Sequence, residues 1–536
     1  MLPESEEDEM NLASYLERSV RENPQQVAIR MDEKEITYEQ FDQRARALAA
    51  YFRQNGFAKG DKVGIYLANC PDYLILFYAA WMLGGVAVPI NYRFRQEELA
   101  FVIADAEIKW LALTREDLEK LQDILTDHEH IRLLLAGELE EGNRHTCLSE
   151  IYKTSLEQKV SVLPCRDSED AMLMYTSGTT GKPKGVRQTH RTNSASIEMV
   201  VDAWKLTSRD HILATLPMFH VGGLQCTTLP TLFTGGTVTL LSRWSPKNWI
   251  SQSRELQPTW SGLISTMLID VVNFFKANPQ EQRQMNHYRL CFFGGSPTPS
   301  VICEYFEEVV GVNLLEIYGQ TELSGLMITY QAGERRIPGS MGKPMAQVVE
   351  TKIVSADGER LIAPGDEEAG VMYLRGDVVT PGYWKRDELN RERFEDGWLK
   401  TGDIVRWDEN GYLYYTDRFD DLIITGGENV YPKEVENILA EHPSVAEVAV
   451  IGTPHERWVE QVTAIIVPRE EANVAIADIE AFCVLHRGLA GYKRPRKVLF
   501  VSELPKTGSG KINKSILKQQ YRMQHSENET TDGNIV

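Results

Sequence analysis

Residues 175–186, with the sequence YTSGTTGKPKGV, bring small hydroxyl side chains, glycines and lysines together in one short stretch. The hydroxyl and backbone N–H groups of residues 176–181 can converge on one anion, and the two glycines there permit close approach of the backbone. Lys182 and Lys184 add positive charge, and Pro183 stiffens the turn between them. The stretch therefore predicts a phosphate-binding loop. A solvated loop rich in turn residues is the alternative.

The spacing differs from that of the P-loop of nucleoside triphosphatases. That motif requires Gly-Lys followed by Ser or Thr, four free positions after its first glycine. Here Gly181 and Lys182 are followed by Pro183, so no hydroxyl that could bind magnesium follows the lysine. The sequence therefore disfavours a standard P-loop enzyme.

The stretch resembles the phosphate-loop signature of the adenylate-forming superfamily, which includes acyl-CoA synthetases, peptide-synthetase adenylation domains and beetle luciferases. The resemblance covers the chain from about residue 11 to 522. Later motifs occur in the family's order, namely MFHVGGL at 218–224, LLEIYGQTE at 314–322, GWLKTGD at 397–403 and PKTGSGKI at 505–512. This conjunction is more specific than any single motif.

The resemblance implies that ATP and magnesium bind at matching positions. The residues implied to surround the nucleotide include Thr176, Ser177, Gly178, Thr179, Thr180, Lys184, Gly319 and Gln320. Gly295 and Ser296 are expected to line the adenine, and Tyr318 to stack on it. Thr321 is expected to contact the α-phosphate and Glu322 to hold magnesium. The chemistry agrees, because a carboxylate beside a polyphosphate requires a cation between the two anions.

The resemblance also implies a ribose site and a catalytic lysine. Asp403 would accept the two ribose hydroxyls, and Arg418 would contact ribose and phosphate. Lys511 matches the catalytic lysine, with Lys506 as a neighbour of lesser role. His220 is the candidate beside the carboxylate being activated, and a packed structural histidine is the alternative.

Residues 417–431, DRFDDLIITGGENVY, are expected to join two domains. Asp420 is the predicted pivot, because this stretch, in which a short apolar run leads to a double glycine at 426–427, can absorb a backbone rotation. We expect the rotation to remove Lys511 and to bring Gly426 and Gly427 beside a channel for the pantetheine of coenzyme A (CoA). One cleft would then serve adenylation and thioester formation in turn.

The predicted activity is that of an AMP-forming acyl-CoA synthetase, which converts a carboxylic acid, ATP and CoA to acyl-CoA, AMP and pyrophosphate through an acyl adenylate. A fatty acid is the first choice, because residues 218–224, 260–267 and 292–295 are apolar and carry no evident cation for a second carboxylate. A dicarboxylate such as malonate is therefore disfavoured. An aryl acid of the benzoate or o-succinylbenzoate type is the closest alternative, since aromatic-lined pockets accept either.

Other activities fit less well. The resemblance implies that amino-acid-activating members carry an Asp in this motif, which pairs with the α-ammonium group of the substrate. Residues 219–221 are Phe, His and Val, and an unpaired buried ammonium group would be costly, so an amino acid substrate is disfavoured. Luciferase-like oxidation is not excluded by the motifs. A non-catalytic binding protein of this fold would be expected to lack Lys511 or Glu322, and both are present.

Composition limits the partners. The net charge of −20 argues against nucleic acid or an anionic membrane as a main partner. The seven cysteines form no Cys-x-x-Cys pair, so neither a disulfide framework nor a zinc site is indicated, and a cytoplasmic location fits. The expected partners are a small carboxylic acid and CoA. The oligomeric state stays open, a homodimer included.

One uncharged stretch, residues 73–92, is long enough to suggest a membrane span. Gly84, Gly85 and Pro89 interrupt it. We therefore expect a buried helix, a turn and a buried strand, without stable membrane insertion.

Alternating strand and helix patterns predict an α/β fold. The expected architecture is a large N-terminal domain of helix-covered mixed or parallel sheets, followed by a smaller mobile α+β domain. The expected divisions are an acidic tail at 1–10, an AMP-binding domain at 11–417, a hinge at 418–424, a C-terminal lid domain at 425–522 and a disordered tail at 523–536. Among the expected helices are 38–53, one capped by Thr189 that runs to Trp204, and 432–440.

Overall fold

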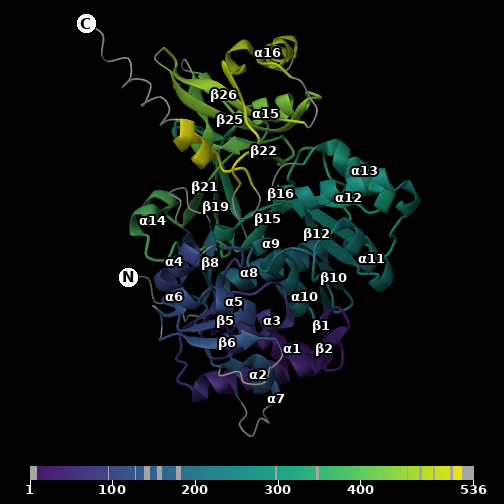
Figure 1. Ribbon diagram of the computed structural model, residues 1–536, viewed down its shortest axis with the longest axis vertical. Helices are drawn as coiled ribbons and strands as arrows, with labels where there is room; N and C mark the ends of the chain where they lie inside the picture. Colours follow the sequence, from purple (N-terminus) through teal and green to yellow (C-terminus); the bar gives the residue numbers. More distant parts are fainter. Residues whose placement is uncertain are drawn as a thin grey trace. The chain divides into compact units, whose positions relative to one another are not determined.

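The computed structural model of the chain (Figure 1) describes residues 9–94, 96–126, 128, 130–137, 145–153, 160–176, 183–295, 298–345, 349–425, 428–455, 457–469, 474–486, 489–506 and 511–521. The chain divides into two units. Unit 1 comprises residues 1–351 and 374–399, and unit 2 comprises residues 352–373 and 400–536. The predicted α/β class, with a large N-terminal and a smaller C-terminal part, is confirmed. The predicted boundaries at 11–417, 418–424 and 425–522 stay predictions, and the tail at 523–536 lies outside the described residues.

One sheet of unit 1 has nine strands in the order β16-β15-β14-β13-β12-β10-β11-β1-β2. From β14 to β1 in this order, neighbouring strands run parallel, whereas β2, β15 and β16 pair antiparallel. Because the carboxyl ends of parallel strands meet at one edge, the turns after β10, β12, β13 and β14 share that edge. The strands are β1 (Val27–Met31), β2 (Lys34–Thr37), β10 (His211–Ala214), β11 (Thr237–Leu240), β12 (Trp260–Ile264), β13 (Leu290–Gly294), β14 (Leu314–Gln320), β15 (Gly325–Thr329) and β16 (Lys343–Pro344).

A second sheet of unit 1 has seven strands in the order β7-β6-β5-β3-β4-β8-β9. All its neighbours run parallel except β8 and β9, which form an antiparallel hairpin. Helix α4 packs its apolar residues against this sheet in a shared core. The strands are β3 (Lys62–Ile65), β4 (Val86–Pro89), β5 (Trp110–Thr114), β6 (Arg132–Ala136), β7 (Thr146–Cys147), β8 (Asp170–Thr176) and β9 (Lys184–Thr189).

Side-chain caps mark the start of several helices of unit 1. Thr37 and Gln40 form a reciprocal capping box at α2, and Thr189 forms one with Thr192 at α8, as the sequence indicates. The helices are α1 (Ser14–Glu22), α2 (Tyr38–Gln54), α3 (Pro71–Met82), α4 (Gln96–Ala106), α5 (Arg115–Lys120), α6 (Gln122–Thr126), α7 (Leu148–Lys153), α8 (His190–Trp204), α9 (Val221–Gly223), α10 (Leu229–Phe233), α11 (Pro246–Leu256), α12 (Ser265–Ala277), α13 (Ser300–Val310) and α14 (Asp387–Arg393).

The uncharged stretch at 73–92 folds as expected. It forms most of α3, which is buried from Tyr73 to Met82, then a turn and the buried strand β4. In the described part of the chain, no helix is both long enough and apolar enough to cross a membrane.

Strands β17 (Glu350–Val354), β19 (Gly370–Arg375) and β21 (Trp398–Trp407) each contain a division point between the units. In unit 2, β17 pairs with β18 (Leu361–Ile362), and β21 pairs with β22 (Leu413–Arg418). In unit 1, the short strand β20 (Phe394–Glu395) pairs with the start of β21.

The last sheet of unit 2 has the order β24-β23-β26-β25, with β27 beside β26. Helices α15 and α16 share its apolar core. The elements are β23 (Ile423–Thr425), β24 (Glu428–Val430), α15 (Pro432–Ala440), β25 (Val445–His455), β26 (Val459–Pro468), α16 (Ile476–Leu485) and β27 (Lys497–Phe500). The predicted helix at 432–440 coincides with α15, which has proline at its first turn.

Candidate active site

The predicted phosphate loop joins β8 to β9, and the paired residues Thr176 and Lys184 stand at its two ends. Between them, residues 177–182 lie outside the described residues, so the roles of Ser177, Gly178, Thr179 and Thr180 stay predictions. The hydroxyl oxygen of Thr176 is buried and has no hydrogen-bond partner among the described residues. A buried polar atom in this position suits a bound hydrogen-bonding ligand.

The candidates for adenine binding follow two neighbouring parallel strands. Strand β13 ends at Gly294 and pairs with β14, so Gly295 and Tyr318 come at the same edge of the sheet. Gly295 has φ +87°, a conformation that favours glycine. Gln320 is the last residue of β14. Ser296 lies outside the described residues.

Contacts from distant segments fix the turn after β14. A Cβ on Gly319 would lie 1.9 Å from a main-chain oxygen of the facing strand β15, so only glycine fits there. Gln188 of β9 donates from Nε2 to the main-chain oxygen of Thr321 at 2.9 Å. The N–H of Thr380 donates to the main-chain oxygen of Glu322 at 2.9 Å. The backbone of the two predicted site residues is therefore held from two sides.

Glu322 is the centre of a charged cluster in unit 1. Its Oε1 accepts a hydrogen bond from the Tyr383 hydroxyl at 2.8 Å and lies 3.3 Å from Nζ of Lys184. Lys184 also donates to the Tyr383 hydroxyl at 3.0 Å, and its Nζ lies 4.2 Å from the centre of the Tyr383 ring. Burial raises the pKa of Glu322, but the charge of Lys184 and the hydrogen bond from Tyr383 outweigh it and lower the pKa. Glu322 is therefore a carboxylate at neutral pH.

An ionised carboxylate beside a phosphate loop fits a magnesium–nucleotide site. Magnesium is usually held by one or two carboxylates together with substrate phosphates and water. The described residues contain no group of three or more His, Cys, Asp or Glu side chains that could hold a metal on their own. A metal at Glu322 would thus take further oxygen ligands from a bound phosphate.

The sequence does not indicate Tyr383, which lies 61 residues from Glu322. No motif of spacing or composition links the two positions. Only the fold brings the hydroxyl to the carboxylate.

His220 directly precedes the short helix α9, makes no side-chain capping bond to it, and is partly buried. Its ring centre lies 4.4 Å from that of Phe219, which in turn lies 5.4 Å from that of Tyr92. A Cβ on Gly223 would lie 2.2 Å from the main-chain oxygen of Pro217, so the backbone doubles back tightly here. A π-helix follows at residues 224–228, and such irregular turns are frequent at functional sites.

The three apolar segments predicted to line the acid pocket lie in or after neighbouring strands of the nine-stranded sheet. Residues 218–224 follow β10, residues 260–267 contain β12, and residues 292–295 end β13. A Cβ on Gly262 would lie 2.2 Å from the ring of Phe292, so glycine at this position makes room for the aromatic ring.

Unit 2 carries the predicted ribose and lysine residues. Asp403 of β21 pairs with Arg418 of β22, and Nη1 of Arg418 donates to Oδ1 of Asp403 at 2.8 Å. Lys511 interacts electrostatically with both side chains. The structure therefore brings these three predicted residues into one neighbourhood of unit 2.

The predicted pivot, Asp420, lies in a short 3-10 turn, Phe419–Asp421. Lys518 donates from Nζ to the main-chain oxygen of Asp420 at 2.7 Å and to Oδ1 of Asp421 at 2.8 Å. Gly426 and Gly427 lie outside the described residues, between the paired strands β23 and β24.

An aromatic and cationic cluster, which the sequence does not indicate, lies beside this hairpin. Thr425 of β23 pairs with Val459. Trp458 is adjacent to Val459. The guanidinium carbon of Arg496 lies over the Trp458 ring, 3.9 Å from its centre. The His455 ring stacks on the Trp458 ring, with 4.2 Å between the two ring centres. An aromatic ring with a guanidinium group can stack on a base and pair with a phosphate.

The sequence matches two family models. The AMP-binding enzyme model matches residues 16–384, and the AMP-binding enzyme C-terminal domain model matches residues 434–511. The chain therefore belongs to the AMP-binding enzyme family, and it is an AMP-forming acid–thiol ligase, an acyl- or aryl-CoA synthetase.

Three curated relatives show the range of acids in this family. The chain is 32% identical to the oxalate–CoA ligase of Arabidopsis thaliana, over 96% of this chain and 99% of that one. It is 33% identical to a feruloyl-CoA synthase of Amycolatopsis, over 95% and 99%. It is 32% identical to the long-chain-fatty-acid–CoA ligase FadD13 of Mycobacterium tuberculosis, over 91% and 93%.

Solved structures share the fold. ATP-bound MatB from Rhodopseudomonas palustris matches with a TM-score of 0.85 at 28% identity, over 96% of this chain and 99% of that one. The o-succinylbenzoate–CoA synthetase MenE of Bacillus subtilis, in complex with ATP and a magnesium ion, matches with a TM-score of 0.81 at 28% identity, over 96% and 100%.

Proposed function

We propose that this enzyme joins an apolar monocarboxylic acid, with a fatty acid as first choice, to CoA at the expense of ATP, with magnesium as the metal. The observation that carries the choice of acid is the lining of the predicted pocket. Residues 218–224, 260–267 and 292–295 lie in or after the neighbouring strands β10, β12 and β13, and they include no Lys, Arg, Asp or Glu. A second carboxylate buried there without a cation would be costly, which disfavours a dicarboxylate such as oxalate or malonate.

An aryl acid is the second candidate, and one observation favours it. The rings of Tyr92, Phe219 and His220 form a contiguous aromatic cluster at the predicted pocket. Such rings pack against a planar substrate as well as against an alkyl chain.

In the first half-reaction, an oxygen of the acid attacks the α-phosphorus of ATP. The bond to pyrophosphate breaks, and an acyl adenylate forms. We assign Thr176, Lys184 and the phosphate loop to the phosphates of ATP, Tyr318 to the adenine, and Thr321 to the α-phosphate. Magnesium held by Glu322 would offset the negative charge of the phosphates. Lys511 would stabilise the charge that develops as pyrophosphate leaves.

In the second half-reaction, the CoA thiol attacks the acyl carbonyl and AMP leaves. We assign Asp403 and Arg418 to the ribose. We assign Asp420 to the pivot, at which a rotation would remove Lys511 from the active site and bring in the hairpin that bears Gly426 and Gly427. The cluster of Trp458, Arg496 and His455 beside this hairpin is our candidate for the nucleotide end of CoA. It combines a stacking surface with a cation.

Pyrophosphate release tests the choice of acid. The purified enzyme is assayed with MgATP and a panel of straight-chain, aromatic and dicarboxylic acids, each with and without CoA. We expect the highest kcat/KM for an apolar monocarboxylate, and acyl-CoA only when CoA is present. A preference for oxalate or malonate would contradict the proposal that the pocket selects an apolar monocarboxylate, and it would leave the class of enzyme unchanged.

A further inference from the structure

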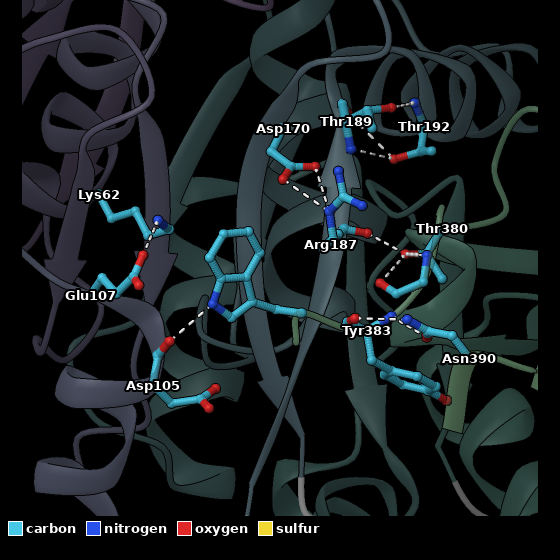
Figure 2. A network of polar contacts seen from close by, with 12 residues as sticks. Lys62, Asp105, Glu107, Asp170, Arg187, Thr189, Thr192, Thr380, Tyr383 and Asn390 are labelled. Carbon is cyan, nitrogen blue, oxygen red and sulfur yellow. Dashed lines mark hydrogen bonds and ion pairs between the residues drawn. The ribbon is translucent and has the colours of Figure 1, made fainter. Parts of the chain in front are cut away.

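A short segment of unit 1 carries Tyr383 to the charged cluster. This crossing segment, residues 380–386, forms an antiparallel bridge with β9. The N–H of Arg187 donates to the main-chain oxygen of Gly382 at 3.1 Å, and the N–H of Trp384 donates back to β9 at 2.8 Å. Arg187 is itself held by Asp170 of β8, at 3.0 and 3.2 Å (Figure 2). The crossing segment is thus fixed to the hairpin that frames the phosphate loop.

The Tyr383 side chain is confined to one orientation. Asn390 accepts from the N–H of Tyr383 at 2.7 Å and donates to its main-chain oxygen at 3.0 Å (Figure 2). The residue is only 1% exposed, and its ring packs edge-on against Phe394. Because the ring is buried and its backbone is held by hydrogen bonds, the Tyr383 hydroxyl is fixed in position beside Glu322.

Asp105 anchors the crossing segment and the phosphate-loop strand together. Its main-chain oxygen accepts from Nε1 of Trp384 at 2.9 Å (Figure 2). Its carboxylate accepts from the hydroxyl of Tyr175, the residue before Thr176, at 2.7 Å and from Arg386 at 2.9 Å. The start of the phosphate loop and the Tyr383 segment therefore share one support.

We propose that Tyr383 is a positioning residue for nucleotide binding that acts through the carboxylate of Glu322. Its hydroxyl donates to Glu322 and accepts from Lys184. The Lys184 ammonium lies 3.3 Å from Oε1 of Glu322 and offsets the charge of the carboxylate. When Lys184 turns to a phosphate, the hydroxyl still holds Oε1 of Glu322 in place. This inference rests on the proposed use of MgATP.

The test is Tyr383→Phe, which keeps the buried ring and removes only the hydroxyl. Calorimetry measures the Kd of MgATP, and of ATP with EDTA, for wild type and variant. We expect the Kd of MgATP to rise about tenfold, as for loss of a hydrogen bond to a charged group. The Kd of ATP in EDTA should change less than about twofold, because the hydroxyl acts on the metal-binding carboxylate.

A matched control removes another buried tyrosine hydroxyl. Tyr38 is fully buried and donates to the main-chain oxygen of Gly236 at 2.7 Å, away from the charged cluster. Tyr38→Phe should lower Tm about as much as Tyr383→Phe and leave both Kd values unchanged. In kinetics, Tyr383→Phe should raise KM for MgATP and leave KM for the acid unchanged.

A double variant separates positioning from packing. If Tyr383 acts through the carboxylate, Tyr383→Phe should add little to Glu322→Gln, because coupled residues are non-additive. Full additivity would overturn the inference, and so would equal losses of affinity with and without magnesium. A wild-type enzyme that binds no MgATP would instead overturn the proposed function. Normal wild-type binding with an unaffected variant would overturn only the role of Tyr383.

Discussion

Replacing Lys518 with methionine should shift the balance between the two half-reactions. Lys518 bonds to the main-chain oxygen of Asp420 at 2.7 Å and to the carboxylate of Asp421 at 2.8 Å. Where the rotation extends past Asp421, to residues 422–424 of the predicted hinge, Lys518 moves relative to Asp420 and Asp421, and these bonds must break or strain. The lysine therefore stabilises the conformation seen in the structure, in which Lys511 interacts with Asp403.

The structure sets the size of the effect. A hydrogen bond to a charged group contributes about 1.5–3 kcal/mol. The side chains of Lys518 and Asp421 are each 21% exposed, so solvent screening reduces this to about 1–1.5 kcal/mol. Such a change shifts the equilibrium between two conformations about 5- to 10-fold. Methionine keeps most of the length of the unbranched side chain and removes the charge.

Single-turnover assays measure the two steps separately. One follows pyrophosphate from ATP and acid, and the other follows acyl-CoA from supplied acyl adenylate and CoA. We expect the ratio of the thioester rate to the adenylation rate to rise about 5- to 10-fold in Lys518→Met. Lys493→Met is the matched control, because Lys493 bonds to Glu434 at 2.7 Å with a similar exposure of 19%. An unchanged ratio in Lys518→Met would refute the role of this contact at the pivot.

Three further predictions concern stability and the two substrates. Burial lowers the pKa of His190 to about 4, and its Nδ1 accepts from the N–H of Leu12, so the folded ring is neutral. The unfolded ring binds its proton from about pH 6.5 downward, whereas the folded ring stays neutral to about pH 4. The free energy of unfolding should therefore fall by about 3 kcal/mol between pH 6.5 and 4. Denaturant titrations of His190→Gln should show a smaller dependence of this free energy on pH. Gly319→Ala should lower adenylation at least about 100-fold, because its Cβ would meet backbone at 1.9 Å, whereas Gly491→Ala, with open space around it, should be neutral in the same assay. Trp458→Ala should raise KM for CoA about tenfold and leave adenylate formation intact, and equal loss of both steps would exclude the proposed CoA contact.

Local sequence patterns predicted the elements that position the site. The cap at Thr189 and the proline at the start of α15 define helix starts through local hydrogen bonding and backbone geometry. Apolar runs that end in glycine, YRLCFFGG at 288–295 and LLEIYG at 314–319, are typical of strands and coincide with β13 and β14. The parallel arrangement then places Gly295 and Tyr318 at one edge.

Strand ends were less predictable, because pairing rather than local composition sets them. The apolar run at 445–451 continues to His455 in β25, through Gly452 and Pro454. Pairing with β26 extends the strand, and Pro454 lies opposite Glu460. Local preference alone would have ended the strand earlier.

Contacts between side chains far apart in sequence could not be predicted from the residues. The hydroxyl of Tyr383 meets the carboxylate of Glu322 across 61 residues, and the ammonium group of Lys518 meets the carboxylate of Asp421 across 97. Each depends on the fold to set a direction for a side chain that has no neighbouring motif. The residues of a recognisable motif are therefore found first, and the residues that orient them emerge only from the structure.

The fate of the carboxylate oxygen tests the central claim, activation of the acid as an acyl adenylate. The enzyme is incubated with MgATP, CoA and its best acid carrying oxygen-18 in the carboxylate, and the products are analysed by mass spectrometry. Attack of that carboxylate on the α-phosphorus predicts one labelled oxygen in each AMP and none in pyrophosphate. Unlabelled AMP, or label in inorganic phosphate with ADP as the product, would contradict the account.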